Sequence, residues 1–519
     1  MNRALKTQKG NNMLTINGED FNCADVARVA RQKVPVSICP EALERIRRSR
    51  AMLEELVDRE AVVYGITTGF GSFSDVTISR EDAIQLQKNL IASHAAAVGD
   101  PLPEDVVRAA LLLRLNALAR GYSGVRPLLV KQLIEVLNKG VVPVIPEQGS
   151  LGASGDLAPL SHLALVLTGE GEAFYQGKKM PGGEALSQAG IEPVTLLEKE
   201  GLALINGTQV MTAIGTLAYH DAVNLLKAAL VTGALTLEAQ QAVLDAFDPL
   251  ISEVRPYRGH KYTAEVINRL VEGSIHIGSD SQKVQDAYSL RCIPQVHGAT
   301  ADALEYVKSI LEVEINSVND NPLLFPDQNR VLSGGNFHGQ PVAQAMDFMA
   351  IAVSELGSIA ERRIERLVNP DLSGLPSFLI EEGGLNSGLM IAQYTAASLV
   401  SENKGLCHPS SVDSIPSSAN QEDHVSMGTT AARKARRVVD NTARVIGIEL
   451  LVAAQAVEFR GADCLGRGTA AAHKALREEV GFLEKDQILY PLIDRAVEMV
   501  TSGHLVKKVE EVISLNIDA

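Results

Sequence analysis

Apolar residues recur at three- and four-residue steps along most of the chain, which is the spacing of helices that bury one face. The pattern is clearest in five segments, and we expect each of them to be a helix: 221–247, 300–318, 341–368, 386–404 and 423–460. The last segment is far longer than an average helix of about 11–12 residues. Because long helices usually pack side by side, the pattern predicts a mainly α protein built on a long central helical bundle.

The first 120 residues are more mixed than the rest. Segments 81–98 and 103–122 have helical spacing, whereas 61–73, "AVVYGITTGFGSF", is rich in glycine and β-branched residues. Further along, "AFYQGKKMPGGEAL" at 173–186 has the turn residues of a hairpin or loop. The start, "MNRALKTQKGNN", is basic but has no apolar stretch. We therefore expect residues 1–12 to be a disordered extension rather than a secretory signal.

One connecting segment is unusually long. "KGLCHPSSVDSIPSSANQED", at 404–423, is rich in Ser, Pro and Asn and lies between two predicted helices. A long segment without regular structure inside a compact domain is often functional. The alternative is that this loop, like the shorter "NSVNDNP" and "RVLSGGNFHGQP", is a surface connector.

Composition narrows the class of protein. Aromatic residues make up only 4% of the 519 residues and Trp is absent, so the core must be built from Ala, Leu, Val and Ile. The net charge of −15 argues against nucleic acid or an anionic membrane as the main partner. The sequence contains no run of about 18 apolar residues, which is the length that would indicate a membrane span. The cysteines are odd in number, lie far apart and form no CxxC, which predicts reduced thiols in a cytoplasm: Cys23, Cys39, Cys292, Cys407 and Cys464.

Common metal and nucleotide motifs are missing from the sequence. The eleven histidines form no HExxH, and nothing in their spacing asks for a metal. "GFGSFS" and "GEGEAF" lack the third glycine of a dinucleotide fingerprint, and no GxxxxGK[ST] occurs. We therefore predict neither a metal site nor a phosphate-binding loop.

The segment Gly152-Ala153-Ser154-Gly155-Asp156 has two interpretations. In the structural one, the small residues are a flexible approach to a helix, with Asp156 as its N-cap and Pro159 in its first turn. In the chemical one, the Gly155 nitrogen attacks the carbonyl carbon of Ala153 and closes a five-membered ring with loss of water. Loss of the Ser154 hydroxyl then leaves an exocyclic methylene, an electrophile that no side chain supplies. Small neighbours let the backbone fold tightly enough.

Several segments together carry a family resemblance. "GSLGASGDLAPLSH" resembles the signature of the ammonia-lyases that form a 4-methylideneimidazole-5-one (MIO) group from their own backbone. This family comprises histidine, phenylalanine and tyrosine ammonia-lyases and related aminomutases. The resemblance covers roughly residues 13 to 515, and the further matching segments follow the family's order: "YGITTGFG", "LINGTQ", "VQDAYSLRCIPQVHG", "NDNPL", "SGGNFHGQP", "ERRIERLVNP" and "SANQEDHVSM".

The resemblance implies an architecture as well as a chemistry. It implies the mainly α, fumarase/aspartase-like fold, with a smaller mixed N-terminal domain over 13–118 and a helical bundle domain over 119–519 that carries the MIO loop. It also implies a homotetramer whose active sites draw on several subunits. The only cofactor implied is MIO, formed from Ala153, Ser154 and Gly155, and the partner is a small amino acid.

Two positions resemble the histidine-specific members. Ser93-His94 stands where those members have Ser-His, and Glu422 follows Gln421 as it does in them. A neutral imidazole has one donor and one acceptor, which a His and a carboxylate pair with, whereas a phenyl ring would leave them without partners. The implied reaction is conversion of L-histidine to trans-urocanate and ammonia, the first step of histidine degradation.

The resemblance implies roles for the remaining site residues. Tyr64 is the best candidate for the base that removes the β-proton, and Glu422 is the competing base. Arg291 is expected to hold the substrate carboxylate, with Tyr288 beside it one helical turn earlier. The other expected contacts are donors to the ring oxygen or the carboxylate, and one aromatic residue against the ring: Asn206, Gln285 and Phe337.

Three alternatives stay open. In the first, the enzyme is a tyrosine or phenylalanine ammonia-lyase. In the second, it is an aminomutase that returns the amine to the β-carbon. The third alternative is a fumarase-like or non-catalytic helical scaffold in which residues 153–155 stay unmodified.

Overall fold

A computed structural model describes residues 13–59 and 82–516 of the chain. The chain divides into two compact units of three segments each. Unit 1 comprises the residues up to 217 with 308–346 and 409–433, and unit 2 comprises 218–307, 347–408 and the residues from 434 onward. The expected extension 1–12 and the segment 61–73, with Tyr64, lie outside the described residues. The expected domain boundary at 118–119 falls at the end of a helix, α4, and stays a prediction.

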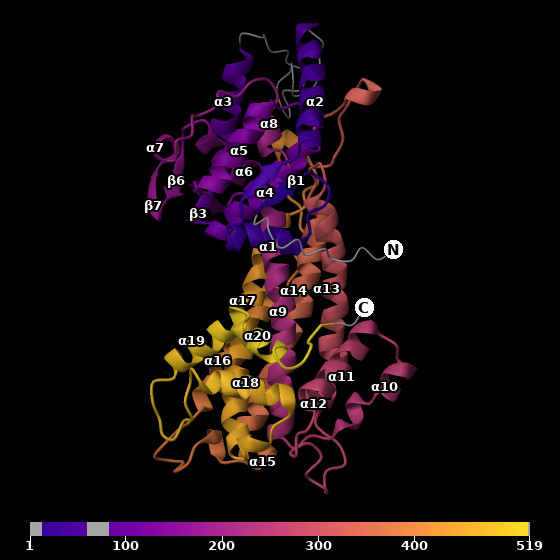
Figure 1. The fold of residues 1–519 in the computed structure, drawn as a ribbon, viewed down its shortest axis with the longest axis vertical. Coiled ribbons are helices and arrows are strands. Elements are labelled where there is room, and N and C mark those ends of the chain that lie inside the picture. The colour runs from indigo at the N-terminus through magenta and orange to yellow at the C-terminus, as the bar shows by residue number, and fades with distance from the viewer. Residues whose placement is uncertain (1–12, 60–81, 517–519) are drawn as a thin grey trace. The chain divides into compact units, whose positions relative to one another are not determined.

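Unit 1 combines short helices with four small sheets (Figure 1). Its helices are α1 (Cys23–Arg31), α2 (Pro40–Asp58), α3 (Ala83–His94), α4 (Glu104–Ala119), α5 (Pro127–Lys139), α6 (Leu157–Leu167), α7 (Gly182–Gln188) and α8 (Glu200–Ile205). Its strands are β1 (Leu14–Ile16), β2 (Val36–Ile38), β3 (Val98–Pro101), β4 (Val142–Pro143), β5 (Pro146–Gln148), β6 (Glu172–Tyr175), β7 (Lys178–Pro181), β8 (Leu323–Phe325) and β9 (Arg330–Leu332).

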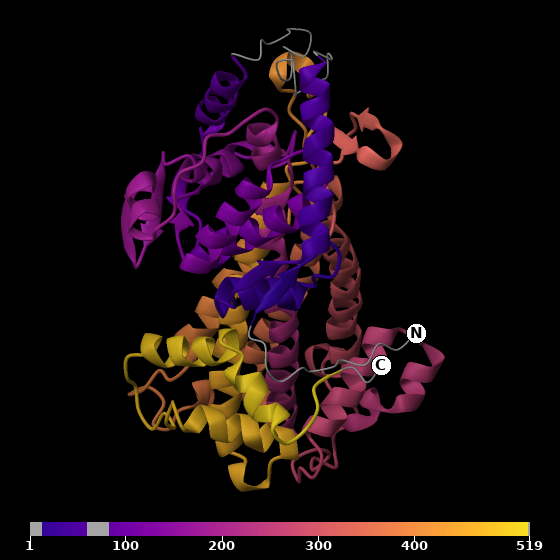
Figure 2. The same ribbon diagram turned by 45° about the horizontal axis from the view of Figure 1, so that its top comes forward.

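The sheets of unit 1 are small and mostly antiparallel. β1 and β2 pair in parallel, β3 pairs with β5, β4, β6 and β7 form a three-stranded sheet, and β8 pairs with β9. The β6–β7 pair confirms the hairpin expected at 173–186. The β8–β9 hairpin lies beside α2 in both ribbon views (Figures 1 and 2), where Arg48 and Asp327 form an ion pair.

Unit 2 is almost wholly helical. Its shorter helices are α10 (Pro249–Val254), α11 (Arg258–Leu270), α12 (Tyr288–Arg291), α15 (Pro370–Ser373), α16 (Met390–Leu406), α18 (Arg467–Arg477), α19 (Tyr490–Thr501) and α20 (His504–Glu510). The chain passes between the two units five times. Four passages lie within long helices, α9 (Gln209–Ala239), α13 (Ile293–Ile315), α14 (Gln340–Val368) and α17 (Gly428–Glu458), and the fifth lies between His408 and Pro409, just after α16. The expected long helices are therefore present, as α9, α13, α14, α16 and α17, with shifted ends, and the mainly α fold is confirmed.

Small residues let the long helices of unit 2 pack closely. A Cβ on Gly233 of α9 would lie 3.4 Å from the Ile293 side chain of α13. A Cβ on Gly357 of α14 would lie 3.4 Å from the Thr442 hydroxyl of α17. α9, α13 and α14 also run side by side in Figure 1. The buried side chains are mostly Ala, Leu, Val and Ile, as expected, although Phe247 and Tyr262 of unit 2 are buried as well.

A buried ion pair joins three of these helices in unit 2. Arg363 of α14 donates through Nη2 to Glu449 of α17 at 2.9 Å, and both side chains are fully buried. The Thr232 and Thr236 hydroxyls of α9 donate to the same carboxylate at 2.6 and 3.1 Å. A buried carboxylate is tolerated only when donors surround it, so this network fixes how the three helices align.

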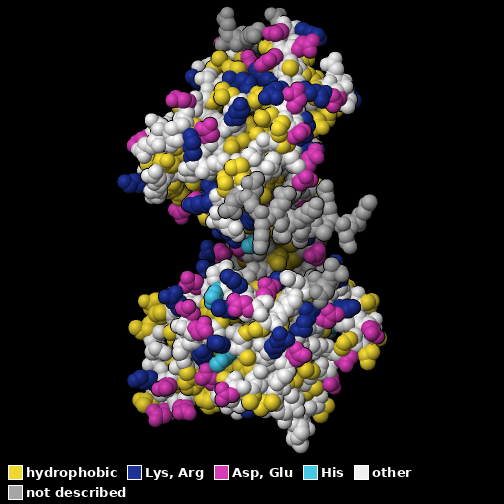
Figure 3. Space-filling model, in the orientation of Figure 1, with side chains coloured by type: hydrophobic (Ala, Val, Ile, Leu, Met, Phe, Trp, Pro, Cys, Tyr) yellow, Lys and Arg dark blue, Asp and Glu magenta, His cyan; other side chains and the backbone are white. Residues whose placement is uncertain are grey.

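Two helices, α9 and α14, are long and apolar enough to cross a membrane by length and composition alone. Their most apolar stretches are 83% and 61% buried inside the protein, as expected of core helices. Across the surface drawn in Figure 3, acidic and basic side chains are interspersed with hydrophobic ones. Among the described residues, no group of three His, Cys, Asp or Glu side chains could hold a metal ion.

Candidate active site

The segment 152–156 lies between β5 and α6 in unit 1 and is folded against the turn that joins α8 to α9. Gly155 has a φ of +71°, and its backbone pairs with Gly207. The amide of Asp156 donates to the Gly207 carbonyl at 2.7 Å. A Cβ on Gly155 would lie only 2.2 Å from that carbonyl oxygen. Both the conformation and the space at this position therefore require glycine.

Asp156 occupies the N-cap position of α6, as expected, but its side chain makes no hydrogen bond to that helix. Instead the carboxylate accepts the amides of Val210 and Met211 at 2.9 and 2.8 Å, in the first turn of α9. It also accepts the hydroxyls of Ser150, at 2.8 Å, and Thr429. The expected cap is therefore corrected. Asp156 caps α9 and not α6, because the first amides of α9, which have no partner within their own helix, point at its carboxylate.

The start of α17 holds the other side of the loop. Ala153 packs against Val425 and Met427 in a small buried cluster. The amides of Ser426 and Met427 donate to the carbonyls of Gly152 and Leu151, both at 3.2 Å. Residues 423–427 were expected to be helical. They are not: the amides of Ser426 and Met427 pair with the 151–152 backbone, and the Val425 amide donates to the Ser414 hydroxyl.

Glu422 contacts Ser154 directly. The Ser154 hydroxyl donates to Glu422 Oε1 at 3.0 Å, and the Ser417 hydroxyl donates to Oε2 at 2.9 Å. Backbone hydrogen bonds between Ser417 and Glu422 close the turn that carries the carboxylate. The carboxylate is therefore held by its own loop and accepts the hydroxyl of Ser154.

That turn is conformationally unusual. Ser418, Ala419 and Asn420 have φ values of +50°, +53° and +66°. Left-handed conformation costs non-glycine residues about 1–2 kcal/mol each, and such cost is retained mainly where function requires the geometry. The structure thus supports the expectation that the long loop 404–423 is more than a connector.

His94 is the last residue of α3 and lies close enough to Glu422 to feel its charge. Burial lowers the pKa of His94, while the Leu90 carbonyl and the Glu422 carboxylate oppose the shift. The Ser93 hydroxyl donates to the Leu90 carbonyl at 3.1 Å and lies 3.0 Å from His94 Nδ1. Nδ1 is therefore engaged by Ser93, and Nε2 is the ring nitrogen left for a ligand.

The remaining site residues of unit 1 lie on neighbouring segments. Asn206 caps the C-terminus of α8, is 5% exposed, and its side-chain oxygen has no partner among the described residues. Phe337 is half-buried in a turn before α14, and Gln421 is exposed beside Glu422. His338 donates through Nε2 to the His424 carbonyl at 3.2 Å and so joins these two segments. No sequence signal had singled out His338.

A second cluster lies in unit 2. Arg291 donates to the Gln285 side chain at 2.8 Å, and its guanidinium lies over the Tyr288 ring at 4.7 Å. Tyr288 is 71% exposed. α12 ends at Arg291 and α13 begins two residues later, with Pro294 in its first turn rather than in a kink. The three expected residues are therefore together.

The residues at 152–155 suit an internal ring. The Gly155 position excludes any side chain, and a Cβ on Gly152 would lie 2.3 Å from the Ser426 hydroxyl. The unpartnered side-chain oxygen of Asn206 is buried on the segment that holds Gly207. The segment therefore has the compactness and the polar neighbours that the MIO group requires.

Comparison with known proteins agrees with this geometry. The family profile "aromatic amino acid lyase" matches residues 21–478. A histidine ammonia-lyase of Alkaliphilus metalliredigens is 58% identical over 97% of this chain and 99% of its own length. The crystal structure of a histidine ammonia-lyase from Trypanosoma cruzi matches with a TM-score of 0.91 and 43% identity, over 97% of this chain and 96% of that one.

A tyrosine aminomutase from Streptomyces globisporus has a similar fold, with a TM-score of 0.93 and 38% identity over 97% of this chain and all of that one. Fold alone thus does not distinguish a lyase, which releases ammonia, from an aminomutase, which returns the amine to the β-carbon. The identity to the lyases, the profile match and the arrangement of Ser154 with Glu422 agree, and the chain belongs to the aromatic amino acid lyase family.

Proposed function

We propose that this enzyme eliminates ammonia from L-histidine to give trans-urocanate, using an MIO group formed from Ala153, Ser154 and Gly155. The observation that carries the proposal is the meeting of Ser154, Glu422 and His94 in unit 1. The identity to proteins named histidine ammonia-lyase supports the choice of substrate. The compartment that we propose is the cytoplasm, where the five cysteines stay free thiols.

The imidazole of the substrate is recognised by Glu422 and His94. The ring N–H donates to the carboxylate of Glu422, and the second ring nitrogen faces Nε2 of His94. Two facing nitrogens need one proton between them. Burial lowers the pKa of His94, and the charge of Glu422 opposes this shift. A phenyl or phenol ring would leave both protein groups without partners, which costs about 1–3 kcal/mol for each group.

Formation of the ring frees Glu422 for this role. Oε1 accepts from the Ser154 hydroxyl, and this hydroxyl leaves when the ring forms. Oε2 keeps its bond to Ser417, so the carboxylate stays oriented. The MIO group, once formed, supplies an electrophilic methylene carbon for the substrate amine. Elimination then breaks the Cα–N bond, transfers a β-proton to a base and leaves a carbon–carbon double bond.

We assign the base to Tyr64, with Glu422 as the alternative. A phenol ordinarily titrates near 10 and needs donors or positive charge to act as a phenolate. Because Glu422 is committed to Ser417 and to the imidazole, it is the weaker candidate. A Tyr64→Phe variant that retains the mass deficit of the ring but loses turnover supports the assignment, whereas near wild-type turnover transfers the role to Glu422.

Arg291 is proposed to bind the substrate carboxylate, with Gln285 and Tyr288 holding the guanidinium. The Tyr288 ring and the Gln285 oxygen already orient it. Its Nε is buried without a partner among the described residues, so donors remain for a carboxylate. Asn206 is the further polar contact, for the carboxylate or the ring oxygen.

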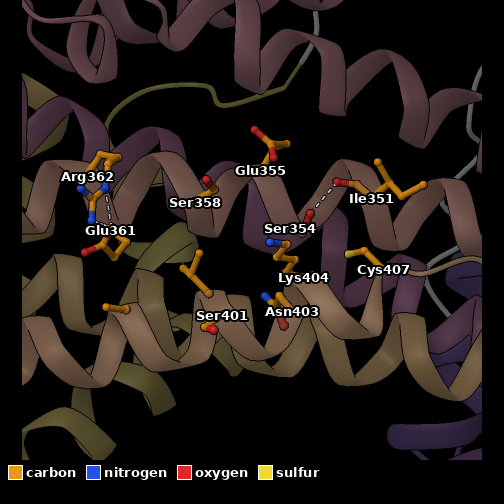
Figure 4. A pocket seen from close by; sticks show the side chains of 12 residues that line it. Ile351, Ser354, Glu355, Ser358, Glu361, Arg362, Ser401, Asn403, Lys404 and Cys407 are labelled. Carbon is orange, nitrogen blue, oxygen red and sulfur yellow. Dashed lines mark hydrogen bonds and ion pairs between the residues drawn. The ribbon is translucent and has the colours of Figure 1, made fainter.

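The protein is proposed to be a homotetramer with shared active sites. α14 and α16 flank a groove of about 570 Å³, lined by Ile351, Ser354, Lys404 and Cys407 among others (Figure 4). On the same helices Phe348, Ile391 and Tyr394 are large apolar side chains that stay exposed. Exposed apolar side chains next to a groove favour a second copy of the chain as the occupant.

Turnover of histidine, tyrosine and phenylalanine, compared under identical conditions, tests the substrate. We expect histidine to be preferred by several orders of magnitude, with trans-urocanate as the only organic product. Preference for tyrosine, or a β-amino acid product, contradicts the assignment of His94 and Glu422. Intact mass tests the ring, because the wild-type chain must lack the mass of two waters localised to 153–155, whereas Ser154→Ala must lack that deficit and the activity while staying folded.

Co-expression of two inactive variants tests the sharing of sites. Ser154→Ala and Arg291→Ala each disable one cluster, so neither homotetramer is active. If a site takes its clusters from two subunits, random assembly leaves about a quarter of the sites intact. Light scattering of the same sample gives the oligomeric state. No recovery of activity in a mixed tetramer means that both clusters come from one chain.

A further inference from the structure

Arg114 is a fully buried arginine in the middle of α4, at 0% exposure. It donates through Nη1 to the Ala203 carbonyl and through Nη2 to the Asn206 carbonyl, both at 3.0 Å. Nη2 also donates to the side-chain oxygen of Gln209. These three acceptors belong to the end of α8, the connecting turn and the start of α9, so one guanidinium joins both sides of the turn.

This contact is one of several that hold the turn. The Gly207 backbone also pairs with Gly155, and the Thr208 hydroxyl donates to Glu314 and accepts from Asn319. Carbonyls at a helix C-terminus have no partner within the helix, and Arg114 satisfies two of them at the end of α8. A Cβ on Gly207 would lie 2.3 Å from Nη2, so the backbone at Gly207 rests directly against the guanidinium. The φ of +151° at Gly207 is likewise open to glycine alone.

The opposite side of Gly207 meets the ring-forming segment. Its carbonyl accepts the Asp156 amide at 2.7 Å and lies where a Cβ on Gly155 would be. The Gly155 nitrogen is the nucleophile of ring closure. A line of contacts thus runs from Arg114 through Asn206 and Gly207 to Gly155.

Packing alone does not account for an arginine here. Every hydrogen bond of the guanidinium to a described residue ends on a neutral oxygen, and the carboxylates of Asp320 and Asp156 act only through space. Burial lowers the pKa of Arg114 to about 10, so a charged group is still kept in the interior at neutral pH. An apolar residue of similar volume would avoid this desolvation. What an arginine offers here, and an apolar residue lacks, is its set of directional hydrogen-bond donors.

We infer that Arg114 is a positioning residue for MIO formation: it holds the Asn206–Gly207 turn so that Gly155 presents its nitrogen to the Ala153 carbonyl carbon. Ring closure forms that N–C bond, and the carbonyl oxygen leaves as water with the amide hydrogens of Ser154 and Gly155. The Ser154 hydroxyl and the Cα hydrogen leave as the second water. The inference rests on the proposed function, because it presumes that the ring forms.

Arg108 provides a matched control on the same helix. It is also buried, at 3% exposure, and donates to the carbonyls of Val29 and Leu137. Neither acceptor belongs to the segments around 153–156 or 203–209. Lysine at either position keeps the charge but replaces the rigid fork by a single nitrogen. Any general cost of losing a buried arginine therefore falls on both variants.

The experiment compares intact mass, circular dichroism and melting temperature for wild type, Arg114→Lys and Arg108→Lys. We expect both variants to fold and to lose melting temperature similarly. The share of chains with the two-water deficit falls by more than about tenfold in Arg114→Lys, as a displacement near 1 Å predicts, and stays complete in Arg108→Lys. A complete deficit in folded Arg114→Lys overturns the inference, as does an equal loss in both variants.

Two further outcomes keep the test decisive. If Arg114→Lys does not fold, Gly207→Ala takes its place in the experiment. This variant leaves Arg114 in place but separates it from the turn. A folded Gly207→Ala chain with the complete deficit overturns the inference, and a lost deficit supports it. If the wild-type chain itself carries no mass deficit, the proposed function fails. The wild-type sample therefore distinguishes failure of the proposed function from failure of the inference about Arg114.

Discussion

Replacing Gly155 with alanine changes the shape of the ring-forming segment and leaves its chemistry in place, because alanine keeps the amide nitrogen. The added Cβ would lie 2.2 Å from the Gly207 oxygen and 2.4 Å from its carbonyl carbon, whereas ordinary contact begins at 3.4 Å. Both atoms are backbone, so no side-chain rotation relieves the overlap. The two segments must separate by roughly 1 Å, the displacement at which reacting groups lose about 10²-fold in rate.

The conformation adds a second cost. A φ of +71° disfavours alanine by about 1–2 kcal/mol. That cost is shared by Gly190, which has a φ of +63° and no atom within 4 Å of its would-be Cβ. Gly190→Ala therefore measures the conformational cost alone. Gly152→Ala is intermediate, because its neighbour at 2.3 Å is a side-chain hydroxyl, that of Ser426, and the nearest backbone atoms lie at 3.1 Å.

Intact mass and turnover of the three variants give the answer. We expect Gly190→Ala to form the ring completely and to lose only stability. Gly152→Ala should form it partly, and Gly155→Ala about 10²-fold more slowly than wild type, measured as the deficit that accumulates after refolding. A Gly155→Ala chain that acquires the deficit as fast as Gly190→Ala would refute the view that contact with Gly207 sets the geometry of ring closure.

Three further predictions concern stability and the thiols. Burial, with Arg363 nearby, lowers the pKa of His297 from 6.5 to about 3. The unfolded chain therefore takes up a proton below pH 6.5 that the folded chain refuses, and stability falls by about 2 kcal/mol between pH 6.5 and pH 5. His297→Gln should show a smaller difference in melting temperature between pH 8 and pH 5, and an unchanged difference contradicts this. Arg363→Met leaves Glu449 buried without its cation and should lower the free energy of unfolding, measured by calorimetry, by about 3–5 kcal/mol. The double variant Arg363→Met/Glu449→Leu should recover much of this loss, and no recovery would argue against an ionic cause. Cys464 is exposed whereas burial raises the pKa of Cys23 to about 12, so an alkylating reagent should label Cys464 first in the native protein, as peptide mass will show.

Periodicity located the long helices but not their ends, and the reasons are specific. α9 begins at Gln209, well before the predicted 221, because the Asp156 carboxylate caps its first turn from another segment. It ends at Ala239, before the predicted 247, where Gln241 turns left-handed with a φ of +51°. Apolar spacing reports which face a helix buries, and it carries no information on caps supplied from distant parts of the chain.

The site shows the same limit. The resemblance named Ser154, His94 and Glu422, but three further facts come only from the structure. These are the bond from Ser154 to Glu422, the left-handed turn at 418–420 and the contact of the Ser93 hydroxyl with Nδ1 of His94. Each arises from contacts or conformations that residue identities do not specify. The positions of Tyr64 and of the proposed subunit contacts stay predictions.

Asp156 illustrates why local rules fail at this site in particular. An aspartate after a glycine-rich turn ordinarily caps the helix that follows, and α6 does follow. The carboxylate instead accepts four donors, from Ser150, Val210, Met211 and Thr429. Three segments are thereby fastened to the residue next to Gly155. Under the proposed function, this segment brings its own amide nitrogen to its own carbonyl carbon, which needs restraint from several directions that a cap within one helix cannot provide. The departure from the local rule is therefore what the proposed ring closure requires.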